Sequence, residues 1–281
     1  MSSSPSRAAA RSRGSPPEAG ALNWVCCTCA AQFAEGAEPP ERCPICEDER
    51  QYVGLSGQRW TTMSELARDH RCEVREDAGL LGIGVEPSFA IGQRMLLLET
   101  GEGNVLWDMI PLVDEAAVDA VRARGEVRAI AISHPHYYSG MVEWSRALGG
   151  VPILLHEADR EWIMRPDPTI ELWSGERREL FGGATLLRLG GHFAGGTVLH
   201  HDETLLTGDI VQVIPDRRFV GFMWSYPNLI PLPAAEVERI AAALEPWHVE
   251  RIVGAWWERV VERDGNEVVR RSAERYVRAL A

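Results

Sequence analysis

Short apolar runs of strand length recur along the chain from residue 80 onward, and most of them are bounded by Gly, Pro or Asp. Bounded runs of about four to eight apolar residues are typical of buried β-strands. Between two of them, Gly101-Glu102-Gly103-Asn104 predicts the tight turn of a hairpin. The predicted strands cover residues 80–85, 94–99, 104–108, 128–132, 152–155, 185–189, 197–200 and 204–207.

Apolar residues at helical spacing alternate with the later strands. Asp114 stands before one predicted helix, with Glu115 in its first turn, which suits the positive end of the helix dipole. Strands that pair first as hairpins and then alternate with helices predict an α/β (α+β) fold. The predicted helices cover about 62–70, 114–124, 140–148, 157–163, 233–244 and 266–280.

Composition divides the chain into three parts. Residues 1–22 are rich in Ser, Ala, Pro, Gly and Arg and predict a disordered tail. Residues 23–52 form a cysteine-containing module, and residues 53–281 form the main domain. No apolar run approaches the roughly 20 residues that span a bilayer, and the N-terminus lacks the apolar stretch of a signal peptide. We therefore expect a cytoplasmic protein without membrane contact.

Charge excludes one class of partner. The chain of 281 residues is 45% hydrophobic and 25% charged, which is ordinary for a globular protein, and its net charge is −12. A general nucleic-acid binder needs a basic face, so nucleic acid is not an expected partner.

Two Cys-x-x-Cys pairs predict a metal site in the module. Cys26 and Cys29 are followed, after thirteen residues, by Cys43 and Cys46. Four thiolates at this spacing close a tetrahedron around one ion, which stabilises a unit too small to fold on its own core. The arrangement resembles a rubredoxin-like or zinc-ribbon knuckle. Zn²⁺ there implies a structural role or a protein partner that docks on the knuckle, whereas iron implies electron transfer.

Three histidines and an aspartate stand in motif-like places in the main domain. A predicted strand ends at Ser133-His134-Pro135-His136, and in an extended segment His134 and His136 point to the same side. His192 lies in a glycine-rich loop, Gly190 to Gly196, and Asp209 ends the run Leu205-Leu206-Thr207-Gly208. Imidazoles gathered at strand ends predict that they hold one cation.

This ordered set resembles the metallo-β-lactamase fold superfamily over about residues 53–281. The family pattern is His-x-His-x-Asp-His, then a glycine-flanked histidine, then a strand that ends in Gly-Asp. The resemblance implies an αββα sandwich with a metal site at one edge between the sheets. It implies His134, His136 and His192 as ligands, with Asp209 as a fourth ligand or as an acceptor that orients a histidine.

The departures from the family pattern concern the second metal of the dinuclear members. Tyr138 and Ser139 stand where the pattern has Asp and His, and Ala255 stands where a late histidine is usual. Loss at all three positions predicts one Zn²⁺ in the main domain.

The sequence therefore predicts a metallo-hydrolase that uses hydroxide on one zinc to cleave a small-molecule ester, thioester, lactone or phosphoester. Asp209 is the predicted residue that holds the attacking water, and Tyr138 a predicted donor to the oxyanion. One alternative is a non-haem Fe(II) oxygenase similar to persulfide dioxygenases, with His134, His192 and Asp209 on iron. Another is a catalytically weak, metal-stabilised protein that binds a partner. Four aromatic residues are expected either to line an apolar substrate pocket or to fill the core: Trp224, Tyr226, Trp256 and Trp257.

Overall fold

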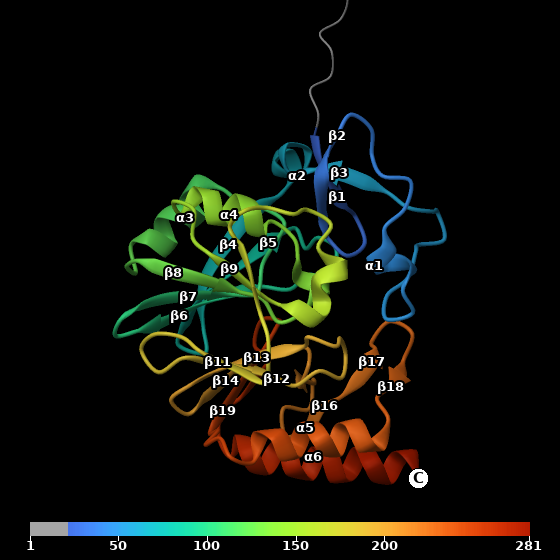
Figure 1. The fold of residues 1–281 in the computed structure, drawn as a ribbon, viewed down its shortest axis with the longest axis vertical. Helices are drawn as coiled ribbons and strands as arrows, with labels where there is room; N and C mark the ends of the chain where they lie inside the picture. Colours follow the sequence, from blue (N-terminus) through green and yellow to red (C-terminus); the bar gives the residue numbers. More distant parts are fainter. Residues whose placement is uncertain (1–21) are drawn as a thin grey trace, which may run out of the picture.

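The computed structural model describes residues 22–281 of the chain. Two β-sheets lie face to face, and helices cover the outer side of each sheet (Figure 1). The predicted αββα sandwich is therefore confirmed. The disordered tail expected over 1–22 lies, apart from Leu22, outside the described residues.

The first sheet has seven strands and the second has six. Across the first sheet the order is β10 (Ile170–Trp173), β9 (Ile153–His156), β8 (Val127–Ala131), β7 (Gly103–Trp107), β6 (Met95–Thr100), β5 (Leu80–Glu86) and β4 (Arg71–Asp77). Across the second it is β11 (Arg177–Glu179), β12 (Thr185–Arg188), β13 (Thr197–His201), β14 (Thr204–Gly208), β19 (Arg251–Gly254) and β20 (Val260–Val261).

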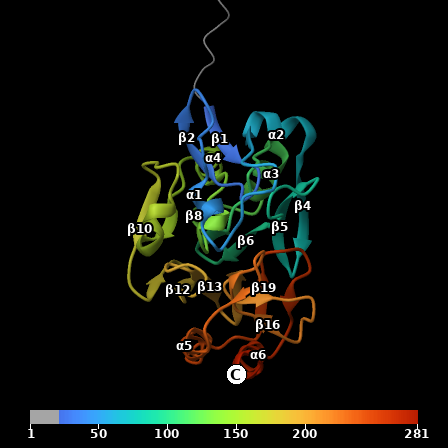
Figure 2. The same cartoon turned by 90° about the vertical axis from the view of Figure 1, so that its right-hand side faces the viewer.

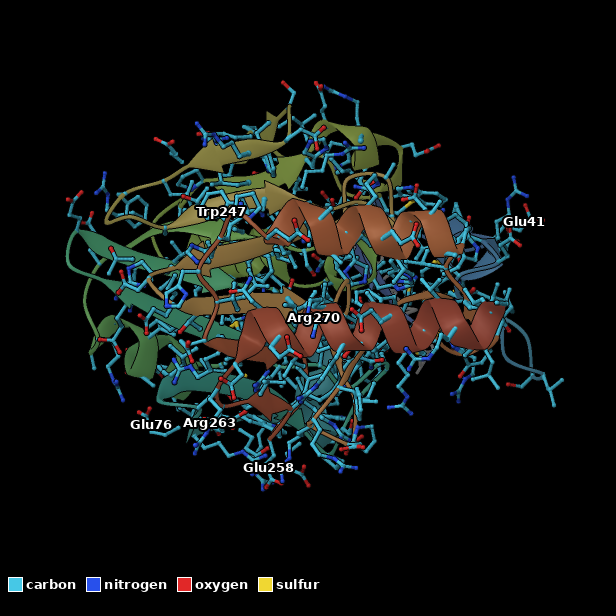
Figure 3. The ribbon with its side chains drawn as sticks, turned by 90° about the horizontal axis from the view of Figure 1, so that it is seen from below. Glu41, Glu76, Trp247, Glu258, Arg263 and Arg270 are labelled. Atoms are coloured by element: carbon cyan, nitrogen blue, oxygen red, sulfur yellow. The ribbon has the colours of Figure 1, made fainter. Side chains whose placement is uncertain are left out.

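Two pairs of helices form the outer layers. Helices α3 (Glu115–Arg122) and α4 (Met141–Ala147) cover the first sheet. Helices α5 (Ala234–Leu244) and α6 (Gly265–Leu280) run side by side over the second, and Figure 3 shows Arg270 on the outer surface of α6. No helix within residues 22–281 combines the length and the apolarity that crossing a bilayer requires.

Side-chain alternation along β6 separates two layers of core. Leu96 and Leu98 belong to the cluster between the sheets, together with Leu199 and Leu206 of the second sheet. Leu97 points the other way, into the cluster that α3 and α4 cover. The period of two that defines a strand therefore gives β6 two buried faces, as its continuous apolar run indicates.

The N-terminal segment forms a small sheet of its own beside the sandwich (Figure 2). The strand order is β2 (Gln32–Gly36), β1 (Leu22–Cys26) and β3 (Trp60–Thr62), and the short helix α1 (Pro44–Glu47) follows Cys43. β3 lies beyond residue 52, so the sheet draws on both sides of the predicted boundary. That 23–52 and 53–281 are separate folding units stays a prediction.

The remaining elements are short. Helix α2 (Met63–Asp69) follows β3, and two-stranded sheets connect β14 to α5. They consist of β15 (Gln212–Val213) with β16 (Val220–Gly221), and of β17 (Met223–Ser225) with β18 (Ile230–Pro231). In Figure 1, the loop that follows α1 approaches the segment of β17 and β18 from above, although these segments are far apart in the sequence.

The predicted elements are largely confirmed. Each predicted strand agrees with an observed strand to within one residue at either end, and β6 and β7 form the predicted hairpin. The helix expected at 157–163 is instead a kinked 3₁₀ segment, Glu157–Trp162. Strand β4 was not predicted, because its mixed and mostly exposed sequence carries no apolar run.

Candidate metal centre

The loop after β8 presents two histidines from one turn. His134 has an extended backbone, with φ −169° and ψ 172°, as expected for a residue before proline. The next residues form a single 3₁₀ turn, Pro135–Tyr137, so the segment is not extended throughout as we expected. His136 reaches the same place as His134 by this turn rather than by strand alternation.

The structure brings His134, His136, His192 and Asp209 together. One potential ligand atom from each lies within 4.8 Å of all the others, and all four residues are buried. Nδ1 of His136 lies 3.2 Å from Nε2 of His192, and Nε2 of His134 lies 3.2 Å from Oδ1 of Asp209. A tetrahedral zinc site with bonds of about 2.0–2.1 Å has edges of roughly 3.3 Å, so these spacings fit one ion.

Unsatisfied polar atoms support this fit. Nε2 of His134 and Oδ1 of Asp209 are buried, and neither has a hydrogen-bond partner. Burying such atoms without compensation is costly, and a cation between them removes that cost.

Hydrogen bonds on the outer side of the cluster fix the tautomers of two histidines. The Ser133 hydroxyl donates to Oδ1 of Asp108 at 2.7 Å, so it accepts the proton of His134 Nδ1 at 2.9 Å. Nδ1 of His192 donates to the carbonyl of Trp224 at 2.7 Å. Each bond leaves the Nε2 lone pair of that histidine directed into the cluster, as metal ligation requires.

Burial keeps the three imidazoles in the neutral form that binds metal. It lowers the pKa of His192 to about 4 and the pKa values of His134 and His136 well below their ordinary value, so the imidazoles are neutral. Burial and the nearby charge of Asp108 raise the pKa of Asp209 well above its usual range. A bound cation would oppose this rise in the pKa of Asp209, because it favours the ionised carboxylate.

The turn into Asp209 depends on a glycine. Gly208 has φ +55°, and a Cβ atom there would lie 2.4 Å from the Ser133 hydroxyl. No larger residue fits without displacing Ser133, so Gly208 permits the close approach of β14 to the loop that carries His134.

The four predicted cysteine ligands also converge. Sγ of Cys26 lies 3.5 Å from Sγ of Cys46, and Sγ of Cys29 lies 3.7 Å from Sγ of Cys43. Metal–sulfur bonds of about 2.3 Å give tetrahedral edges of roughly 3.8 Å, close to these distances. Within residues 22–281, the cysteine and histidine clusters are the two groups of metal-binding side chains that converge in this way.

The two tyrosines after His136 have different surroundings. The Tyr137 ring packs edge-on against His134 with centroids 4.4 Å apart, and its buried hydroxyl has no hydrogen-bond partner. Tyr138, the predicted oxyanion donor, belongs together with Tyr137 to the buried core cluster beneath α3 and α4. No contact supports the role of Tyr138, which stays a prediction. Ser139 and Ala255 are buried as well.

Of the four aromatic residues expected near the site, two reach it. Trp224 supplies the carbonyl that holds His192, and the ring centroid of Tyr226 lies 5.7 Å from that of His192. Trp256 donates to the carbonyl of Ile91, and Trp257 stacks on Arg75 away from the cluster. The histidines outside the cluster interact elsewhere, either with main-chain atoms or, for His248, with surface carboxylates: His70, His156, His200, His201 and His248.

The sequence did not indicate three residues that support the site. Asp108 ends β7 as Asp209 ends β14, so a strand-end carboxylate was the signal available for it. Asp159 accepts a hydrogen bond from the Gly195 amide at 2.8 Å and so holds the loop of His192. Arg50 lies in the cysteine module and bonds to the carbonyl of His192, a contact that no local pattern reveals.

Several solved metallo-β-lactamases have this fold. The enzyme DIM-1 superposes with a TM-score of 0.57 at 11% identity, over 75% of this chain and 98% of DIM-1. FIM-1 from Pseudomonas aeruginosa, solved in its mono-zinc form, has a TM-score of 0.53 at 14% identity, over 73% of this chain and 96% of FIM-1. The enzyme from Pontibacter korlensis also has a TM-score of 0.53 at 14% identity, over 74% and 99%.

A sequence relative covers nearly the whole chain. The uncharacterized protein YmaE of Bacillus subtilis strain 168 is 46% identical over 266 residues, which span 92% of this chain and 96% of YmaE. The chain belongs to the same family as YmaE and has the fold of metallo-β-lactamases. No protein-family model matches it. Together, these comparisons show a metallo-β-lactamase fold, and the structure places a buried group of three histidines and one aspartate with the spacing of a metal site in it.

Proposed function

We propose that the chain is a hydrolase with one zinc ion held by His134, His136 and His192, and that Asp209 lies beside a fourth coordination position that is open to water. The observation that carries this proposal is the convergence of three imidazole nitrogens and one carboxylate oxygen at tetrahedral spacing. The orphaned atoms of His134 and Asp209 support it independently.

A zinc ion in such a site polarises a substrate carbonyl or phosphoryl oxygen and lowers the pKa of a bound water to roughly 7. The chain's own residues do the positioning. Asp209 is proposed to hold the attacking water and accept its proton, and the Tyr226 hydroxyl fixes Asp209 by donating to its main-chain carbonyl at 2.6 Å. Asp108, Ser133 and the Trp224 carbonyl keep two of the imidazoles in the tautomer that binds metal.

The positions of the missing ligands support a mononuclear site. Ser139 and Ala255 are buried, and neither offers a side chain that ligates zinc strongly. The proposed substrates are small-molecule esters, thioesters, lactones or phosphoesters. We propose zinc also for the four-cysteine site, where the sulfur spacing fits a closed structural centre.

The geometry favours this proposal over the iron oxygenase. An iron triad needs two histidines and a carboxylate. Here His136 approaches His192 as closely as Asp209 approaches His134, so a third imidazole belongs to the set. Three imidazoles with an open fourth position are an arrangement of catalytic zinc sites.

Metal analysis joined to turnover tests the proposal. Native mass spectrometry of the full chain is expected to show two zinc ions, and a panel of esters, thioesters, lactones and phosphodiesters supplies the substrate. His192→Ala is expected to lose one ion and all turnover, because two histidines rarely hold a catalytic zinc. The matched control is His248→Ala, whose side chain is 65% exposed and lies outside the cluster. Iron in the histidine site, or full activity of metal-free His192→Ala, overturns the zinc hydrolase.

A further inference from the structure

Arg50 is a buried cation that lies between the cysteine module and the histidine cluster. Arg50 is 8% exposed. It donates two hydrogen bonds to the carboxylate of Asp48, from Nε to Oδ1 at 2.6 Å and from Nη2 to Oδ2 at 2.9 Å. Arg50 and Asp48 follow directly after the last cysteine ligand, Cys46, and the short helix α1. The bidentate pair holds the guanidinium plane in one orientation.

The third nitrogen of this guanidinium contacts the loop that carries His192. Nη1 of Arg50 donates to the main-chain carbonyl of His192 at 3.2 Å. The guanidinium carbon lies 3.9 Å from the ring centroid of Phe193 and 4.7 Å from that of Trp224. Trp224 is also the residue whose carbonyl binds His192 Nδ1, so Arg50 contacts both segments that fix the His192 imidazole.

The module touches the other ligand loop as well. The amide of Gln32 in β2 donates to the carbonyl of Tyr138 at 3.3 Å, two residues after His136. The side-chain amide of Asn228 donates to the carbonyls of Glu49 and Gln51, on either side of Arg50, at 2.9 Å each. Figure 1 shows the same relation, with the loop that follows α1 next to the loop that joins β17 and β18. The cysteine module therefore forms part of the wall around the histidine cluster.

A metal ion in the cysteine site would hold this wall in place. The buried residues of the module are mostly the cysteines themselves with Ala31, Phe33 and Ile45, which is a small core. Units of this size depend on their ion for folding, so loss of the ion frees the Asp48–Arg50 pair.

We infer that Arg50 is a positioning residue of the histidine site and that metal in the cysteine site raises the metal affinity of the histidine site through it. The inference rests on the proposed function only in that both clusters hold metal. Lysine does not replace Arg50, because it lacks the planar fork that binds Asp48 and His192 together and stacks on the rings.

The test measures the Zn²⁺ affinity of the histidine site in the full chain, by competition with a chromophoric chelator. Arg50→Ala, Arg50→Lys and Cys43→Ser are each expected to weaken it by about 10- to 100-fold, as loss of a partner that orients a ligand does. The matched control is Arg42→Ala in the same module, whose side chain is 71% exposed and is expected to leave the affinity unchanged.

A double variant separates coupling from general damage. If Arg50 carries the coupling, Arg50→Ala with Cys43→Ser weakens the histidine site no more than Cys43→Ser alone. Co²⁺ substitution reports the two sites separately, since only the cysteine site gives thiolate-to-cobalt charge-transfer bands. Arg50→Ala is expected to keep these bands, which shows that its module is folded and loaded.

The outcomes distinguish this inference from the proposed function. Unchanged histidine-site affinity in Arg50→Ala overturns the coupling, even if the wild-type chain hydrolyses a substrate. Additive losses in the double variant overturn Arg50 as its carrier. A wild-type chain that binds two ions and hydrolyses nothing overturns the hydrolase and leaves the coupling standing.

Discussion

Asp108 and Ser133 are joined by two hydrogen bonds to the same carboxylate oxygen. Oδ1 of Asp108 accepts from the Ser133 amide at 2.8 Å and from its hydroxyl at 2.7 Å. Because the hydroxyl proton is committed to Asp108, the hydroxyl oxygen can only accept from Nδ1 of His134. The pair therefore sets which nitrogen of His134 faces the metal centre.

Ser133→Ala is expected to weaken zinc binding at the histidine site by about 10- to 100-fold, because His134 Nδ1 loses its acceptor. Zinc titration against a competing chelator measures this. Ser145→Ala is the matched control, since Ser145 is also buried and its hydroxyl donates to the carbonyl of Val151 away from the site. The control is expected to cost about 1 kcal/mol of stability without changing zinc affinity. Equal zinc affinity in the two variants would contradict the role of Ser133.

Gly195→Ala is expected to destabilise the fold by about 1–3 kcal/mol through overpacking. A Cβ atom at Gly195 would lie 2.7 Å from Oδ2 of Asp159 and 2.9 Å from Cβ of His156. The free energy of unfolding from urea denaturation measures the effect. Gly54→Ala is the control, because a Cβ atom there meets nothing within 4 Å. An unchanged free energy of unfolding in Gly195→Ala would contradict this prediction, because it would show that Asp159 can move aside without loss of stability.

Asp159 also gives the fold a pH dependence of defined sign. Burial raises its pKa from 3.8 to about 6, so the folded state binds the proton more tightly than the unfolded state. Protonation of Asp159 therefore stabilises the fold at low pH, and that stabilisation is lost as the pH rises from about 4 through 6. Relative to Asp159→Asn, the wild-type chain is expected to lose on the order of 1 kcal/mol between pH 5 and pH 7.5. The free energy of unfolding, measured against pH, would contradict this prediction if it changed equally in the wild-type chain and in Asp159→Asn.

Much of this site follows from local sequence, and the rest does not. The strand before His134 ends in the apolar run Ala129 to Ile132, and the strand before Asp209 carries Leu205 and Leu206, and these apolar residues indicate both the buried position of each strand and the place of the polar residue after it. The contact of Arg50 with His192 joins residues 142 apart in the chain, so no short-range pattern contains it. The acceptor for His192 is the main-chain carbonyl of Trp224, and a carbonyl has no signature in the sequence.

Loss of one thiolate is expected to release one ion and to leave the sandwich folded. The sandwich has its own apolar clusters between the sheets and beneath each helix layer, whereas the module's core is built around the cysteines. Native mass spectrometry of Cys43→Ser should show one zinc ion fewer than the wild-type chain. Limited proteolysis should cut within 23–52 and spare 53–281. Cooperative loss of both regions would show that the module and the sandwich are a single folding unit.

The last prediction concerns the hydroxyl that stabilises the developing oxyanion. Removing such a donor typically lowers the rate by about 100- to 1000-fold, which is the loss that Tyr138→Phe must show if the sequence-based prediction is correct. The contacts give Tyr137 the stronger case, because its ring packs against His134 and its buried hydroxyl has no partner. We therefore expect the larger fall in turnover for Tyr137→Phe, measured on whichever ester, lactone or phosphodiester the wild-type chain accepts. Zinc content serves as the control, since neither hydroxyl belongs to the proposed ligand set. An unchanged rate in both variants would leave the two tyrosines as core residues and assign the oxyanion to the metal alone.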